Sequence, residues 1–338
     1  DDVVVKHPKL FTAFVAACAL CLGACGIHVE SPSSLPALTG FALSRDTSAR
    51  TEAAAADRAH SLASLATQCA SCSSALEAVA TSSRERLEFL GGVWEPWKGR
   101  EDAASLPQPE AIAEAPYTVK DFVSWLVISA RRDLQTAANP TMTSSEEARQ
   151  LSAVALGRYA SAVQLANAYA IDVDEGTHDV DVLAQRLIGQ SGKTPSWIVR
   201  SGTSSDLALP QPSQTTSAFA NSEQAAQTTA NWDCIAQTLP KSAVTSEDFA
   251  SATTIENALL DRASRSLERG SKDTRQLRCS MPDHSPASLA QASMRADINL
   301  FASDSQEVRL FGAHAALDDV RLWTQAPGVS IPAVVTLQ

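Results

Sequence analysis

The sequence predicts an all-α protein, and its composition is the first reason. Hydrophobic residues make up 44% of the 338 residues, but aromatic residues make up only 5%, and there are 14 glycines. Alanine, leucine and serine dominate, which favours closely packed helices, because alanine has the highest helix propensity and strands are enriched in β-branched and aromatic residues. The second reason is the spacing of apolar residues by threes and fours, which is typical of helices that bury one face.

Residues 40–170 are expected to form four helices. The first is rich in alanine and carries regularly spaced charges, among them Glu52, as a helix with one buried side should. Capping boxes, in which a hydroxyl and a carboxylate satisfy each other's backbone N–H groups, predict two helix starts, Ser74 to Glu77 and Ser144 to Glu147. Long helices with short turns and one longer crossover indicate an antiparallel four-helix bundle. The expected helices are 36–67, 74–90, 118–138 and 144–170.

Residues 171–217 are expected to link this bundle to a second one over 218–338. The segment opens with acidic residues and continues with glycine, serine and proline, which are typical of connections. Thr245 and Asp248 are expected to form a third capping box, and Ser285 followed by Pro286 to begin another helix. The expected helices are 218–239, 245–269, one from 285 and 304–325, followed by an apolar segment over 331–338 that packs on the bundle.

The two bundles are expected to be copies of one unit. Identical residues recur without a gap at a constant offset in the two fourth helices, and a related match lies late in the two third helices. Both Glu147 and Glu307 are then expected to hold the third position of a capping box. The recurring pairs are Ser145/Ser305, Glu147/Glu307, Arg149/Arg309, Ala153/Ala313 and Ala155/Ala315, with Ser129/Ser293, Arg131/Arg295 and Asp133/Asp297 upstream.

The N-terminal residues predict export and anchoring. Residues 10–25 are an apolar run preceded by Lys6 and Lys9, which is the layout of a secretory signal, and the run is shorter than the ~20 residues of a spanning helix. Its end, Leu22-Gly23-Ala24-Cys25, resembles the lipobox of bacterial lipoproteins. That resemblance implies lipidation of Cys25 and cleavage before it. The expected division is a signal peptide over 1–24 and a tether over 25–39.

Four further cysteines predict two disulfides, because an exported chain passes into an oxidising compartment. Cys69, Cys72, Cys234 and Cys279 allow three connectivities. The Cys69-x-x-Cys72 motif could also belong to a redox or zinc site. The chain has no second such motif and no βαβ pattern around this one, which disfavours both kinds of site. We therefore expect Cys69–Cys72 as a staple across a helix turn, and Cys234–Cys279 as the second pair.

The alanine-rich charged helix, the short turn and the segment SSRERLEFLGGVWEPW at 82–97 resemble the ferritin-like helical domains of bacterial lipoproteins of unknown function. Ferritin-like bundles often hold two metals through Glu and Glu-x-x-His ligands. The chain contains no Glu-x-x-His, and Asp57-x-x-His60 is the nearest approach to that motif. The candidate metal ligands are Glu307, His314 and Asp318, which share one stripe of a predicted helix. No cofactor is expected, and a metal site is the alternative.

The net charge of −11 and the isoelectric point near 5.0 argue against nucleic acid as a partner. The leading hypothesis is a lipid-anchored, non-enzymatic interaction or accessory subunit of a membrane or cell-envelope complex, such as a respiratory one, on the extracytoplasmic face of the cell membrane. The alternative is a ferritin-like metal-binding protein or oxidoreductase. A third hypothesis is a small-ligand carrier, which would show as an apolar cavity between the bundles.

Overall fold

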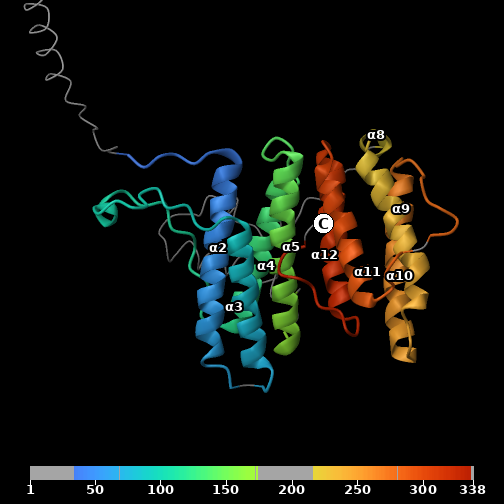
Figure 1. Ribbon diagram of the computed structural model, residues 1–338, viewed down its shortest axis with the longest axis horizontal. Helices are drawn as coiled ribbons and strands as arrows, with labels where there is room; N and C mark the ends of the chain where they lie inside the picture. Colours follow the sequence, from blue (N-terminus) through green and yellow to red (C-terminus); the bar gives the residue numbers. More distant parts are fainter. Residues whose placement is uncertain (1–33, 68, 172, 174–215, 280, 336–338) are drawn as a thin grey trace, which may run out of the picture. The chain divides into compact units, whose positions relative to one another are not determined.

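The computed structural model describes residues 34–67, 69–171, 173, 216–279 and 281–335. Every regular element among these residues is a helix, which confirms the all-α prediction (Figure 1). The predicted signal peptide, Cys25 and most of the predicted tether and linker lie outside the described residues. Within the described part of the chain, no helix is long and apolar enough to cross a membrane.

The four helices of the first half pack in a closed ring. α2 contacts α3 and α4, and α5 contacts the same two helices. The predicted capping box at Ser144 and Glu147 is confirmed, with the Glu147 carboxylate 2.8 Å from the Ser144 backbone nitrogen. The predicted box at Ser74 is wrong, because α3 begins two residues earlier and Glu77 instead contacts His60 Nδ1 at 3.0 Å. The helices are α2 (Gly40–Ala63), α3 (Cys72–Phe89), α4 (Val119–Ala137) and α5 (Ser145–Ala168).

The second half repeats this ring: α9 contacts α10 and α11, and α12 contacts the same two helices. The capping box of Thr245 with Asp248 and the start at Ser285 with Pro286 are confirmed. The main helices are α9 (Glu223–Thr238), α10 (Ser246–Glu268), α11 (Pro286–Asn299) and α12 (Gln306–Thr324). Short helices are η1 (Ala103–Ser105), α8 (Thr216–Ala220), η3 (Leu239–Lys241) and η4 (Leu300–Ala302).

The capping box predicted for Glu307 is wrong. Ser305 is the residue that caps α12, and its side chain makes no capping hydrogen bond. The backbone N–H of Ser305 donates to the Ser303 hydroxyl at 3.2 Å, so the donor that Glu307 would satisfy is already bonded. Glu147 and Glu307 therefore do not share a role.

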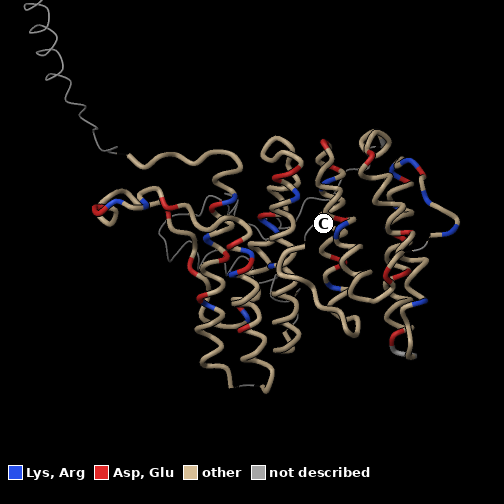
Figure 2. The backbone as a smooth tube through the Cα atoms, in the orientation of Figure 1, with Lys and Arg blue, Asp and Glu red and all other residues tan. Residues whose placement is uncertain are grey.

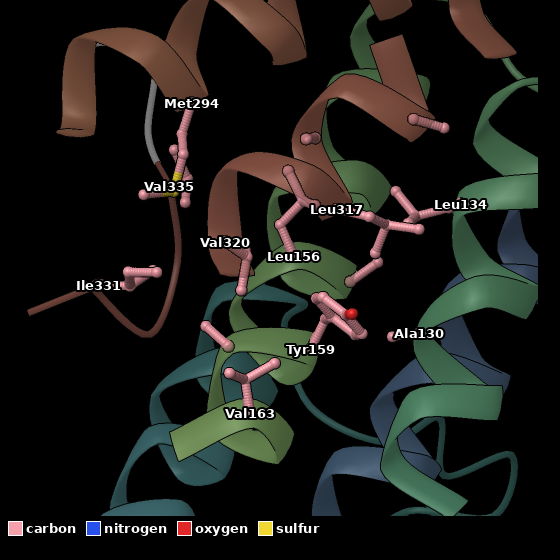
Figure 3. Packing of buried hydrophobic residues seen from close by; sticks show 14 of the residues in the cluster. Ala130, Leu134, Leu156, Tyr159, Val163, Met294, Leu317, Val320, Ile331 and Val335 are labelled. Carbon is pink, nitrogen blue, oxygen red and sulfur yellow. The ribbon is translucent and has the colours of Figure 1, made fainter. Parts of the chain in front are cut away.

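The two rings meet along α5 and α12 and share one hydrophobic core. Leu156 and Tyr159 of α5 lie beside Leu317 of α12 (Figure 3). Polar contacts add to this packing: the Ser145 hydroxyl donates to the Ala302 carbonyl at 2.8 Å, and Arg309 donates to the Ala137 carbonyl at 3.1 Å. Arg309 thus satisfies a carbonyl at the end of α4, a group that the helix itself leaves without a partner.

The C-terminal segment crosses α5 at Gly157. A Cβ at this position would lie 1.7 Å from the Ala333 carbonyl oxygen, so a residue without a side chain is required. Ile331 and Val335 are buried on either side of Ala333, which confirms the expected packing for 331–335 (Figure 3).

Residues Glu95–Glu110 belong to a separate compact unit. Within this unit, the Trp97 indole donates to the Pro107 carbonyl at 2.7 Å, and Arg100 pairs with Asp102 at 2.7 Å.

Candidate functional site

A network of charged side chains lies inside the first ring. Arg158 of α5 is its centre: Nε donates to Glu52 at 2.7 Å, Nη1 to Asp133 at 2.8 Å and Nη2 to the Ser48 hydroxyl at 2.8 Å. Arg86 of α3 approaches the other oxygen of Glu52 at 2.9 Å. All five side chains are buried, so each of the four helices contributes a polar group to the interior.

The first network surrounds its two carboxyl groups with arginine side chains. Burial alone would raise the pKa of Asp133, but the positive charges of Arg132 and Arg158 outweigh burial and lower it. Burial also lowers the pKa of Arg86, with Glu52 opposing this shift. Glutamate and aspartate bound by arginine in this way are structural ion pairs, because each charge has a counter-charge at hydrogen-bond distance.

A smaller network lies inside the second ring. Arg262 of α10 places Nη1 2.6 Å from Asp319 of α12 and 3.7 Å from Asp297 of α11. The Trp232 indole donates to Asp297 at 2.9 Å, and the Ser293 hydroxyl donates to Asp319. Here two buried carboxyl groups face one guanidinium group, so the second network has one acid more than it has cations.

The surroundings of Asp297 favour its protonated form. Burial and the adjacent Asp319 hold the pKa of Asp297 well above its ordinary value, and Arg262 only partly opposes them. A protonated Asp297 is a donor, which lets two buried carboxyl groups lie side by side without mutual repulsion.

We expect Asp297→Asn to flatten the pH dependence of stability. A carboxyl group with a raised folded pKa stabilises fully below the unfolded pKa of about 3.9 and loses that contribution as the pH rises through its folded pKa. The variant keeps a donor toward Asp319 and carries no ionisable proton, so its free energy of unfolding should exceed that of the parent increasingly above about pH 4.

Urea unfolding between pH 4 and pH 9 measures this difference. The matched control is Asp319→Asn, which removes the partner that Arg262 contacts at 2.6 Å and should destabilise the protein at neutral pH. Parallel pH curves for Asp297→Asn and the parent protein would contradict the assignment of the proton.

A hollow of about 220 Å³ opens between α10 and α12, above the second network. Among the charged residues of the lining, Arg262 is buried and the others are half-buried or exposed. Three arginines, one aspartate and one histidine line the hollow. The lining includes Arg262 and Arg265 of α10, Arg269 directly after α10, and Phe311, His314 and Asp318 of α12.

The predicted metal candidates are only partly brought together. His314 and Asp318 both line the hollow, whereas Glu307 lies in the first turn of α12 and is not part of the lining. Among the described residues, no group of three histidine, cysteine, aspartate or glutamate side chains is placed to hold a metal ion. The lining as a whole suits an anion better than a cation.

Both predicted cysteine pairs lie at disulfide distance. The Cα atoms of Cys69 and Cys72 are 5.2 Å apart, and those of Cys234 and Cys279 are 5.3 Å apart. Both separations fall within the ~4.4–6.8 Å of ordinary disulfides.

The two buried networks and the arginine-lined hollow beside α10 were not predicted from the sequence. A signal was present in Arg158, which interrupts an otherwise apolar and alanine-rich stretch of its helix. Lysine, arginine, aspartate and glutamate positions are spread along the helices of both halves (Figure 2). The fold and the interior define an all-helical protein built around buried ion pairs. Comparisons of the chain with protein-family models, with curated proteins and with solved structures found no match.

Proposed function

We propose that this chain is an exported, lipid-anchored protein that acts as a non-enzymatic interaction or accessory subunit of a membrane or cell-envelope complex. One observation carries the non-enzymatic part: the interior carboxylates of both halves bond arginine, serine or tryptophan side chains of neighbouring helices. A catalytic acid or base has to reach a substrate, and these groups instead join helices. The anchoring part is supported by the resemblance of Leu22-Gly23-Ala24-Cys25 to a lipobox.

The metal-binding or oxidoreductase alternative ranks second for the same reason. Ferritin-like sites use inward carboxylates as metal ligands. In the first ring Glu52 and Asp133 point inward, but each already binds arginine at 2.7–2.8 Å. Elemental analysis of the purified chain separates the two hypotheses, because a stoichiometric transition metal would favour the alternative.

We infer that the two rings are duplicated, ferritin-like four-helix bundles. The helices contact one another in the same order in both halves. Arg86 and Arg262 are buried on the second helix of each ring, and Asp133 and Asp297 on the third. These matches support a common origin, although Arg149 is half-buried and Arg309 is fully buried.

The anchoring proposal predicts that Cys25→Ser abolishes lipid labelling. The thiol is the group that would carry the lipid, and each buried CH₂ of an acyl chain contributes about 0.8 kcal/mol to membrane binding. We expect the variant to lose label in bacterial cells fed a palmitate analogue and to accumulate unprocessed. The matched control is Cys21→Ser, which lies in the same apolar run and should label normally. Mass spectrometry that finds an unmodified Cys25 in the membrane-bound protein would contradict the proposal.

A further inference from the structure

We propose that the hollow between α10 and α12 binds a small molecule that carries a carboxylate or phosphate group. Arg262 and Arg265 of α10, and Arg269 directly after it, follow one another at spacings of three and four residues and line the same hollow. A guanidinium group offers a planar fork of donors that matches carboxylate and phosphate oxygens. This ligand site goes beyond the proposed function and does not depend on it.

Arg262 provides the innermost donor. The residue is only 2% exposed, and its Nη1 is held by Asp319 at 2.6 Å. Its Nε is also buried and has no hydrogen-bond partner among the described residues. Arg262 therefore forms a fixed inner wall of the hollow, and the more accessible donors that a ligand meets are those of Arg265 and Arg269.

Aromatic rings hold two of the three guanidinium groups in place. Arg262 lies 5.2 Å from the ring centroid of Trp232, and Arg269 lies 5.3 Å from that of Phe311 and 5.6 Å from that of Phe219. These distances are within the range of cation–π attraction. Donors that are already ordered lose less conformational freedom when a ligand arrives, which strengthens binding.

The charges around the opening favour an anion. Arg265 pairs with Asp261 at 2.9 Å, but both side chains are half-exposed or more, so this pair is weak and can exchange for a ligand. Asp318 is the carboxylate of the lining, and Arg262 is already paired with Asp319, so the positive charges that a ligand can engage are those of Arg265 and Arg269. A cavity of only ~10–15 Å³ holds one water molecule. The hollow, at about 220 Å³, is therefore large enough for a small polyatomic ligand.

Calorimetric titration of the full chain with inorganic phosphate or acetate, at constant ionic strength with chloride as the reference ion, tests the proposal. We expect saturable binding of at least one of the two anions. Arg265→Gln should weaken it about tenfold or more, because a hydrogen bond from a charged group is lost. The matched control is Arg84→Gln, which makes the same charge change on the exposed side of α3 and should leave the affinity unchanged.

Binding of phosphate alone identifies a phosphate site, and binding of acetate alone or of both anions identifies a carboxylate or general oxyanion site. Each of these results supports the proposal if Arg265→Gln weakens the binding of the anion and Arg84→Gln does not. The proposal is overturned if neither anion binds above chloride, or if Arg265→Gln and Arg84→Gln change the affinity equally. Arg265 is exposed, so thermal unfolding should show a folded variant.

Discussion

Replacing Arg158 with methionine is expected to lower the free energy of unfolding by about 3–5 kcal/mol, the range for a broken buried ion pair. Arg158 holds two carboxylates at once, Glu52 at 2.7 Å and Asp133 at 2.8 Å. Methionine fills part of the same space but donates no hydrogen bond. Both acids would then remain inside the protein, with Glu52 left to Arg86 and Asp133 to Arg132.

Urea unfolding at pH 7 measures the loss, and Arg84→Met on the exposed side of α3 is the matched control, expected within ~0.5 kcal/mol of the parent protein. Adding Glu52→Gln to the Arg158→Met background should cost further stability, because it leaves the buried Arg86 without a counter-charge. If the Arg158 and Arg84 variants lose equal amounts, the buried network does not stabilise the fold as described.

The helix starts that could be predicted are those fixed by short-range hydrogen bonds. The capping boxes at Ser144 and Thr245 each join two residues three positions apart, so both partners can be recognised directly in the sequence. The errors at Ser74 and Glu307 have a common cause: a residue outside the predicted box contacts one of the groups that the box requires. His60 engages Glu77, and Ser303 bonds the backbone N–H of Ser305. Competing partners of this kind are not visible in a capping pattern.

The interior charges could not be predicted, because their partners are distant in the sequence. Glu52 and Arg158 are 106 residues apart. In isolation, Glu52 is one of several regularly spaced charges on a helix, and such charges usually face solvent. The structure instead buries Glu52 completely while Asp57 of the same helix is exposed. Only the assembled ring decides which charge lies inside.

The Cys234–Cys279 pair should contribute far more stability than the Cys69–Cys72 pair. The first closes a loop with a sequence separation of 45, and the second one of only 3. In the chain-entropy model a crosslink stabilises by restricting the unfolded chain, which gives about 4 kcal/mol for the longer loop and less for the shorter one. Gln237 also holds the segment around Cys279, accepting from the Cys279 N–H at 3.2 Å and donating to the Gln276 carbonyl at 3.0 Å. The folded state should therefore survive loss of the crosslink with its local structure intact.

Urea unfolding of Cys234→Ser/Cys279→Ser and of Cys69→Ser/Cys72→Ser, each with and without a reducing agent, measures the two contributions separately. The Cys234/Cys279 variant should unfold at a clearly lower urea concentration than the parent protein, and the reducing agent should change its stability little. The Cys69/Cys72 variant should keep most of the stability of the parent protein, and the reducing agent should still lower its stability strongly. Peptide mapping under non-reducing conditions checks the connectivity directly. Free thiols at Cys234 and Cys279, or a link from either of them to Cys69 or Cys72, would contradict the pairing, and equal losses in the two variants would contradict the loop-length explanation.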